Sequence, residues 1–307
     1  MKIVMMGSGG VGGLIGARLA QVGCDVSFVA RGAHLKAIRE HGLTLESPLG
    51  NVHLPKVRAT DDPRTLGPVD LVFFAVKLWD TEAAARSILP LIGPDTGVIS
   101  LQNGVVKDDI LRPIVGARAL MGGVAYMATT ISRPGVIEHT GTMQRVVFGE
   151  YDGRRSKRAE TLLEALQKTG IDAKLSDDIR RSIWEKFVFL TGMAAVTATI
   201  RLPMGPILGN PLTRAFYLDA MREVAAVGRA HGVRLPEDFA EERLAFTGTL
   251  PATMTASMHH DLERGNPLEV EWLSGSVVEL GAAVGVPTPI HRVVRDILIL
   301  HAQGKKA

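Results

Sequence analysis

The first twelve residues constrain the fold of this chain more than any other segment. Residues 2–6 have the apolar character of a buried strand and run directly into Gly7-Ser8-Gly9-Gly10-Val11-Gly12. A helical pattern over residues 11–22 follows this turn. A GxGxxG turn between a strand and a helix is typical of the first βαβ unit of a doubly wound sheet, whereas the same pattern without that context carries little information.

The glycines of this turn have distinct expected roles. Gly7 permits the tight turn after the strand, Gly9 lets the backbone approach a pyrophosphate, and Gly12 lets the helix and the strand pack closely. The N-terminus of the helix offers N–H groups and a positive dipole to an anion. The remaining residues of the turn, which would share in this contact, are Ser8, Gly10 and Val11. The sequence therefore predicts dinucleotide binding here; a purely structural glycine turn is the alternative.

The end of the second expected strand indicates which dinucleotide is bound. An NAD-type site usually carries an acidic residue about 20 positions after the glycines, where it binds the ribose 2′-hydroxyl. This chain has Arg31 there, after Phe28-Val29-Ala30, and no carboxylate nearby in the sequence. A guanidinium suits a 2′-phosphate, so the sequence favours NADP(H). An exposed loop arginine is the alternative interpretation.

The hydrophobic pattern changes character along the chain. Short apolar runs alternate with helical patterns in the first part, which predicts parallel βαβ units, and long helical patterns separated by proline and glycine follow. We therefore predict an α/β fold, with an N-terminal Rossmann-type doubly wound sheet over residues 1–176 and a C-terminal all-α domain over residues 177–307. The expected strands cover residues 2–6, 25–30, 69–76, 98–101 and 171–175, with an added antiparallel pair at 119–131 and 136–150. The expected helices cover residues 11–22, 34–41, 81–91, 156–169, 179–198, 211–231, 237–246, 252–264 and 269–284.

The composition limits the classes of partner. The net charge of +3 is small for 307 residues and no basic block exceeds three residues, so no nucleic-acid partner is expected. Cys24 is the only cysteine, which excludes an intramolecular disulfide and indicates a reducing, cytoplasmic setting. The strand pattern begins at residue 2 and apolar runs such as residues 69–76 are short, so neither a signal peptide nor a membrane span is expected. The apolar helices of the second half could bury a homodimer interface as readily as a domain core.

Polar residues close two of the expected strands. Lys77 follows the apolar run of residues 72–76, and Asn103 follows residues 98–102, ahead of Gly104. Ligands of doubly wound sheets bind at the carboxyl ends of the strands, so the two residues together are candidates for the cofactor and substrate site. For Lys77 alone, a solvated strand end is the more ordinary interpretation.

Lys186 is the main candidate in the helical half. It lies early in an expected helix and precedes the apolar residues 187–189. Burial beside them would lower its pKa and suit it as a proton donor near neutral pH. A surface lysine with a buried stem fits the pattern equally well.

Other polar residues of the helical half have more ordinary interpretations when taken alone. Ser257 and Glu269 lie near helix boundaries, where such residues are usually caps or surface groups. His259 and His260 point about 100° apart on a helix and have no partner ligands at useful spacing, so no metal site is predicted.

Taken together, these segments resemble the ketopantoate reductases (2-dehydropantoate 2-reductases) from end to end of the chain. Each matching segment is short, but their order and separation together are specific. In order, they are the glycine turn, Arg31, Ala75-Val76-Lys77, Gln102-Asn103-Gly104, Trp184-Glu185-Lys186, Ser257-Met258 and Glu269-Val270-Glu271.

The resemblance implies a mechanism and a small-molecule substrate. NADPH would transfer hydride to the carbonyl carbon of a 2-oxo acid, with ketopantoate of pantothenate biosynthesis as the default, and Lys186 would be the general acid. Glu269 would orient Lys186, bind a substrate hydroxyl and contribute to the cofactor site, and Ser257 would hydrogen-bond the substrate carboxylate. Lys77 and Asn103 would shape the nicotinamide side of the cleft. The resemblance also implies a cleft between the domains that closes on cofactor binding.

One departure from the family pattern concerns the substrate. Ketopantoate reductases usually carry asparagines four and eight residues after the catalytic lysine, and this chain has Leu190 and Ala194. All three positions share one helix face, so two amides are replaced by apolar groups beside Lys186. A site without those amides should discriminate less for a substrate hydroxyl, which favours a more apolar 2-oxo acid as the alternative substrate. A non-catalytic NADP(H)-binding sensor is the alternative from another functional class.

Overall fold

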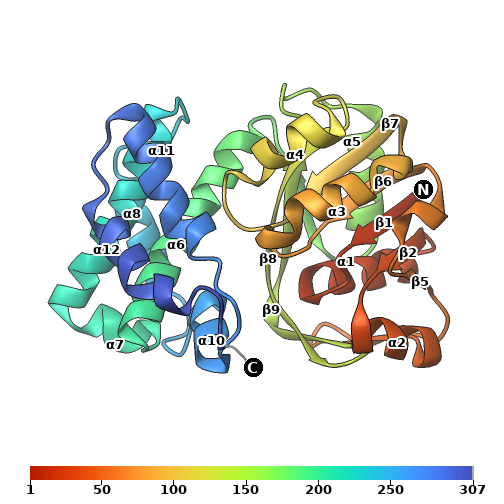
Figure 1. The fold of residues 1–307 in the computed structure, drawn as a ribbon, viewed down its shortest axis with the longest axis horizontal. Helices are drawn as coiled ribbons and strands as arrows, with labels where there is room; N and C mark the ends of the chain where they lie inside the picture. The colour runs from red at the N-terminus through yellow and green to blue at the C-terminus, as the bar shows by residue number, and fades with distance from the viewer. Residues whose placement is uncertain (306–307) are drawn as a thin grey trace. The chain divides into compact units, whose positions relative to one another are not determined.

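The computed structural model describes residues 1–305 and divides into two compact units, which we describe separately (Figure 1). The first unit comprises Met1–Gln102 and Lys107–Ser182, and the second comprises Asn103–Val106 and the residues from Ile183 onward. An N-terminal sheet and a C-terminal set of helices confirm the expected α/β class. The division lies after Ser182, and four residues from the loop after one strand join the helical unit.

The first unit is built on one ten-stranded sheet with the order β4-β3-β9-β8-β7-β6-β1-β2-β5, and β10 pairs with β9. The strands from β8 to β5 in this order run parallel, as a doubly wound sheet requires. The strands are β1 (Lys2–Met6), β2 (Asp25–Val29), β3 (Leu43–Glu46), β4 (Val52–Leu54), β5 (Arg58–Thr60), β6 (Val69–Phe74), β7 (Ile92–Ser100), β8 (Leu120–Arg133), β9 (Val136–Gly149) and β10 (Asp172–Leu175). The helices are α1 (Gly10–Gln21), α2 (Gly32–His41), α3 (Thr81–Ser87), α4 (Lys107–Val115) and α5 (Lys157–Gln167), with short 3₁₀ turns η1 (Pro63–Leu66), η2 (Leu78–Asp80) and η3 (Leu89–Leu91).

Apolar cores cover both faces of the parallel strands. Ile3 and Met5 of β1 pack in one core with residues of α1 and α5. Val4 and Met6 pack in the other with residues of α3 and α4, which lie side by side (Figure 1). Since consecutive strand residues point to opposite faces, a strand covered on both sides must be apolar throughout.

Several elements of this unit are not predicted by the sequence. β4 and β5 are three residues long each, too short for a hydrophobic period to show. α4 begins with Lys107-Asp108-Asp109 and contains Pro113, which is unfavourable in a helix interior. The long pair β8 and β9, in contrast, is antiparallel as expected.

The second unit is helical, as the sequence predicts. Its core gathers apolar residues from α6 to α12 around the long helix α6. The helices are α6 (Ile179–Ile200), α7 (Met204–Gly209), α8 (Pro211–Ala230), α9 (Phe239–Thr247), α10 (Ser257–Arg264), α11 (Ser276–Val284) and α12 (Pro289–Leu298), with a π-helical turn at Glu271–Gly275 and a 3₁₀ turn η5 (Ile299–His301). The expected helix over residues 269–284 is therefore divided into a π turn and α11.

α6 bears on the expectation that no segment of the chain spans a membrane. With 22 residues and a mean hydropathy of 1.3, it is long and apolar enough to cross a membrane by length and composition. In this structure, 67% of its apolar window is buried inside the protein, which is how the core helix of a helical domain behaves.

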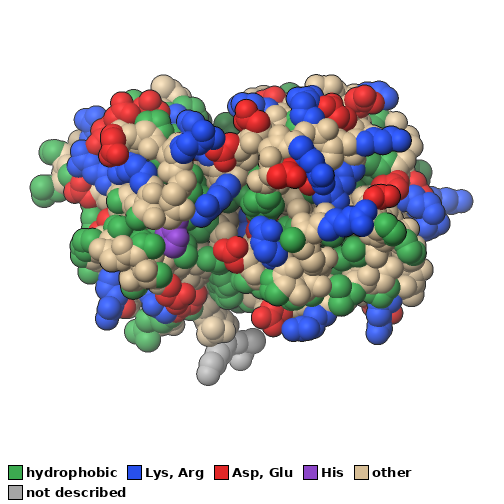
Figure 2. All heavy atoms as spheres, turned by 90° about the horizontal axis from the view of Figure 1, so that it is seen from above, with side chains coloured by type: hydrophobic (Ala, Val, Ile, Leu, Met, Phe, Trp, Pro, Cys, Tyr) green, Lys and Arg blue, Asp and Glu red, His purple; other side chains and the backbone are tan. Residues whose placement is uncertain are grey.

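Charged side chains are mixed on the surface. On the face displayed in Figure 2, lysine and arginine side chains alternate with aspartate and glutamate side chains, and hydrophobic groups lie between them. Over the described residues, many charged side chains form exposed ion pairs, such as Arg118 with Asp95 and Arg222 with Asp219. Such a pattern agrees with the small net charge of the chain.

The core of the helical unit contains a histidine held in its neutral form. His291 is completely buried, with Nε2 2.9 Å from the carbonyl oxygen of Ala220 and Nδ1 3.1 Å from Oγ of Ser274. Nε2 therefore carries the hydrogen that Ala220 accepts. Burial disfavours the imidazolium and lowers the pKa of His291 to about 4.

We expect this histidine to make the protein sensitive to mild acid. The unfolded chain takes up a proton near the ordinary histidine pKa of about 6.5, while the folded chain takes it up only near 4. Stability is therefore lost as the pH falls from about 6.5 to 4, by about 3 kcal/mol from this group. Urea unfolding followed by circular dichroism at pH 7 and pH 4 measures this loss.

Two variants separate this effect from general acid sensitivity. His291→Gln should show a smaller loss of unfolding free energy between the two pH values than the unchanged protein. His41→Gln, which alters a histidine whose side chain is 79% exposed, should show the same loss as the unchanged protein. An equal pH dependence in all three proteins would contradict the role assigned to His291.

Candidate active site

The glycine turn joins β1 to α1 in the conformation that the sequence predicts. Gly7 has a φ of +95°, in the region that favours glycine, and the N–H groups of Gly7 and Ser8 donate to the carbonyl oxygen of Val29 in β2. A Cβ at Gly12 would lie 2.0 Å from the carbonyl oxygen of Gly7, so α1 packs directly on the turn. A Cβ at Gly9 would meet nothing within 4 Å. The closely packed glycines are thus structural, and the backbone at Gly9 borders open space.

The N-terminus of α1 is suited to bind an anion. Gly9 occupies the N-cap position, and within the described residues 1–305 no side chain makes a cap hydrogen bond there. The first turn of α1 contains no acidic residue. Its N–H groups and the positive end of the helix dipole are therefore oriented as a phosphate-binding helix requires.

Arg31 lies at the carboxyl end of β2, where it is the N-cap residue of α2. Its side chain is 73% exposed, and Nη2 donates to Oδ2 of Asp80 at 2.6 Å. The expectation that no carboxylate lies near Arg31 holds only along the sequence, because folding brings in a carboxylate from 49 residues away. Lys77, three residues before Asp80, is exposed and follows β6, with Nζ 5.5 Å from the centre of the Trp79 ring.

The loop after β7 carries Asn103 and belongs to the helical unit. Gln102, which precedes it, is buried and donates from Nε2 to Oγ1 of Thr81 at 2.8 Å. Gly104 has a φ of +86°, and a Cβ there would lie 3.3 Å from the carbonyl oxygen of Trp272 in the π-helical turn. The loop is therefore fixed on both sides of Asn103.

The structure brings Lys186 and Asn103 together within the helical unit. Nζ of Lys186 donates to Oδ1 of Asn103 at 3.0 Å, although the residues are 83 positions apart in the sequence. Lys186 is half-buried, in the second turn of α6. An ammonium group is thus held in a defined direction by an amide oxygen, which is the arrangement that a positioned proton donor needs.

The other two candidates of the helical unit lie next to helix starts, but Glu269 is buried and is not a surface group. Ser257 is exposed and is the first residue of α10, which begins there and not at residue 252. Glu269 is 7% exposed and lies just before the π-helical turn, an irregularity that occurs often at functional sites. The orientation of Lys186 by Glu269 stays a prediction.

Comparison with known proteins identifies the family. The family model described as ketopantoate reductase PanE/ApbA matches residues 3–153, and the model of its C-terminal domain matches residues 178–302. A 2-dehydropantoate 2-reductase from Mesorhizobium japonicum is 35% identical, over 94% of this chain and 94% of the relative. The chain belongs to the ketopantoate reductase family. The resemblance seen in the sequence motifs is confirmed, and the protein is an oxidoreductase of this type.

Solved structures of ketopantoate reductases share the fold. A family member from Ralstonia eutropha has a TM-score of 0.89 at 33% identity, with 98% of both chains covered. A 2-dehydropantoate 2-reductase from Geobacter metallireducens has a TM-score of 0.91 at 30% identity, covering 98% of this chain and 99% of that one. The arrangement of strands and helices described above is therefore that of the family.

Two polar side chains, one half-buried and one completely buried, support the segments that carry the candidate residues, and the sequence did not predict either. His34 in α2 accepts from the N–H of Gly135 at Nδ1 (3.0 Å), and its Nε2 lies 2.9 Å from the carbonyl oxygen of Ser8. The neutral Nε2–H form therefore links the glycine turn to the β8–β9 hairpin, and burial lowers the pKa of His34 accordingly. The sequence signal was a histidine four residues before buried Ile38, on the inward face of a short helix.

Lys107 is the second missed group. It is completely buried, and its Nζ donates to two carbonyl oxygens. One belongs to Ser100, the last residue of β7, and the other to Gly123 in β8. Asp108 lies 3.6 Å from the same amino group and accepts from the hydroxyl of Tyr151. Burial lowers the pKa of Lys107, and the carbonyl oxygens that it binds fix the end of the strand that leads to Asn103.

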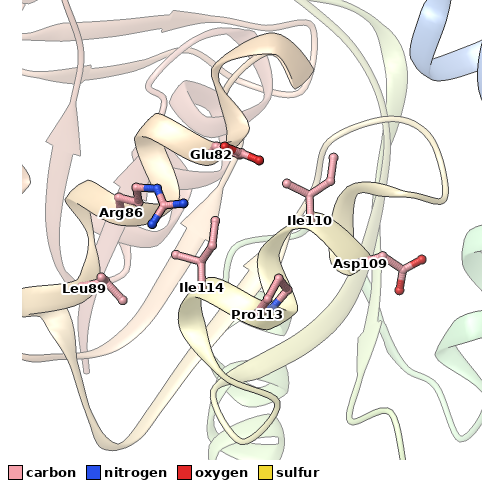
Figure 3. Close-up of a pocket in the computed structure, with 7 residues that line it drawn as sticks. All are labelled: Glu82, Arg86, Leu89, Asp109, Ile110, Pro113 and Ile114. Carbon is pink, nitrogen blue, oxygen red and sulfur yellow. The ribbon is translucent and has the colours of Figure 1, made fainter.

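A surface depression of about 460 Å³ lies elsewhere on the first unit, between α3 and α4 (Figure 3). None of the residues assigned above to cofactor or substrate lines it. Its lining residues are Glu82, Arg86, Leu89, Asp109, Ile110, Pro113 and Ile114. The depression is therefore distinct from the candidate residues of the first unit.

Proposed function

We propose that this protein reduces a 2-oxo acid to the corresponding 2-hydroxy acid with NADPH, with 2-dehydropantoate, the precursor of pantoate in pantothenate biosynthesis, as its first candidate substrate. The observation that carries the proposal is the hydrogen bond from Lys186 to Asn103 in a chain of this family. It gives the helical unit a positioned proton donor, which a reductase of this type needs to protonate the developing alkoxide rapidly.

The first unit supports a dinucleotide cofactor with a 2′-phosphate. The open space at Gly9 and the uncapped N-terminus of α1 fit a pyrophosphate, and Arg31 at the end of β2 fits a 2′-phosphate. When bound, NADPH supplies the hydride that the carbonyl carbon receives. Lys77, at the end of β6, would contribute on the nicotinamide side.

The residues of the helical unit would bind and protonate the substrate. Lys186 would donate a proton from Nζ to the carbonyl oxygen as negative charge develops there. Oδ1 of Asn103 accepts a hydrogen bond from one of the three N–H groups of the ammonium group, and this fixes the direction in which the other two N–H groups point. Ser257 would donate to the substrate carboxylate, and Glu269 would orient Lys186 and accept from a substrate hydroxyl.

The face of α6 around Lys186 favours a second candidate substrate class. Leu190 follows Lys186 by one turn and is half-buried, and Ala194, one turn further, is 1% exposed. These side chains provide no hydrogen-bond partner for a substrate hydroxyl. A 2-oxo acid with an apolar side chain would therefore lose less binding here than a hydroxylated one.

We expect the protein to oxidise NADPH in the presence of 2-oxo acids. The test panel contains 2-dehydropantoate, 2-oxoisovalerate and phenylpyruvate, and the loss of NADPH absorbance measures the rate with each. A kcat/KM that is highest for 2-dehydropantoate supports the first candidate, and one at least about tenfold higher for an apolar acid supports the second. NADPH binding without turnover of any 2-oxo acid would contradict both and favour a cofactor sensor.

A further inference from the structure

The ion pair between Arg31 and Asp80 crosses the place where the glycine turn begins. Arg31 follows β2 and Asp80 follows β6, and these two strands flank β1 in the sheet. The carboxyl end of β1 carries Gly7 and the start of the turn. The 2.6 Å contact between Nη2 and Oδ2 therefore spans the edge of the sheet at which dinucleotides bind.

Asp80 is the better fixed partner of this pair. Its N–H donates to the carbonyl oxygen of Lys77, and its side chain is 29% exposed against 73% for Arg31. The next residue, Thr81, is 1% exposed, donates to the carbonyl oxygen of Leu78 and accepts from Gln102. The backbone that carries the carboxylate is thus held by its own hydrogen bond and by those of buried Thr81, whereas the guanidinium of Arg31 is mostly exposed to solvent.

The carboxylate is directed to Arg31 and not to its own helix. Asp80 ends the η2 turn, precedes α3 with helical dihedral angles (φ −91°, ψ −1°), and makes no cap hydrogen bond to the N-terminus of α3. Its carboxylate binds instead to an arginine 49 residues away, which points to a role for the pair itself.

We propose that Asp80 determines cofactor specificity by competing with the 2′-phosphate of NADPH for Arg31. This inference rests on the proposed use of NADPH. A guanidinium binds carboxylate and phosphate through the same N–H groups, so the phosphate must displace Asp80 and then lies near its negative charge. NADH has no 2′-phosphate and leaves the pair intact. Asp80 therefore reduces the discrimination between NADPH and NADH that Arg31 alone would give.

The test is the Asp80→Asn variant, which keeps the shape of the side chain and removes its charge. We expect it to bind NADPH and adenosine 2′-monophosphate about three- to tenfold more tightly than the unchanged protein, with NADH affinity within about twofold. Isothermal titration calorimetry at low ionic strength measures these affinities, and the gain for NADPH should shrink at high salt. The control is Asp95→Asn, which removes the negative charge from another arginine–aspartate pair, that of Arg118, and should leave the affinities for NADPH and NADH unchanged.

A reference variant separates this inference from the proposed function. Arg31→Ala should lower the affinity for NADPH by about tenfold or more and leave the affinity for NADH unchanged. If Arg31→Ala does not alter the ratio of NADPH to NADH affinity, the assignment of NADPH through Arg31 is wrong. If Arg31→Ala behaves as expected and Asp80→Asn binds NADPH no more tightly, competition by Asp80 is wrong and the NADPH assignment stands.

Discussion

Replacing Lys186 with alanine should lower kcat for 2-oxo acid reduction by about 10²–10⁴-fold while NADPH affinity stays within about twofold. The expected loss is large because a positioned proton donor acts in the transition state and not in cofactor binding. Lys186 is the group that the structure holds by a hydrogen bond to Asn103. Stopped-flow reduction and calorimetric NADPH binding measure the two quantities separately.

Two further variants test the role of Lys186 more sharply. Lys186→Arg keeps the positive charge and the ability to donate to Asn103, but a guanidinium does not give up its proton near neutral pH, so kcat should stay low. Lys157→Ala removes an exposed lysine from α5 and should leave kcat unchanged. An arginine variant with full activity would show that the charge of Lys186, and not its proton, is what catalysis needs.

Alanine substitutions at two glycines of the turn should have opposite kinds of effect. At Gly12, the added Cβ would lie 2.0 Å from the carbonyl oxygen of Gly7, so backbone must move and the unfolding free energy should fall by about 3 kcal/mol. At Gly9, the Cβ meets nothing within 4 Å, so stability should change little. That methyl group would instead occupy the space in which we place the pyrophosphate, and NADPH affinity should fall by about tenfold or more.

Thermal unfolding and calorimetric NADPH titration of both variants check this contrast. Gly9→Ala is the informative one, because it should fold with the unchanged melting temperature and still lose cofactor affinity. Normal NADPH affinity in Gly9→Ala would mean that the dinucleotide does not approach the backbone at this position. Normal stability in Gly12→Ala would mean that α1 can move away from β1 at little cost.

The sequence predicts those parts of the fold in which local pattern and burial agree. The apolar run of β6, the alternation of strands with α1, α3 and α5, and the long helices after residue 177 are all recognisable from hydrophobic spacing. The prediction fails for β4 and β5, because three-residue strands depend on the edge of a sheet that already exists. It fails for α4 because the buried lysine and the internal proline look like loop residues until their partners are known.

The residues of the candidate site also fall into those that the sequence predicts and those that it does not. The glycine turn, Arg31, Lys77, Asn103 and Lys186 lie in segments whose order can be read from one chain. The roles of Asp80, His34 and Lys107 could not be predicted in this manner, even though the spacing of His34 and Ile38 places the histidine on the inward face of its helix. Each acts through a contact made only in three dimensions: Asp80 with Arg31, His34 with the carbonyl oxygen of Ser8, and Lys107 with the ends of neighbouring strands.

The four residues Asn103–Val106 have a consequence for how such enzymes can be recombined. They are enclosed in the sequence by the sheet unit but pack with the helical unit, so the helical unit is not one continuous piece of chain. Consider a chimaera that joins the sheet unit of one relative to the helices of another at residue 182. Its Lys186 would face an Asn103 loop from the other parent, and its Trp272 would face a Gly104 from the other parent. Grafting residues 103–106 together with the helices would keep these contacts within one parent.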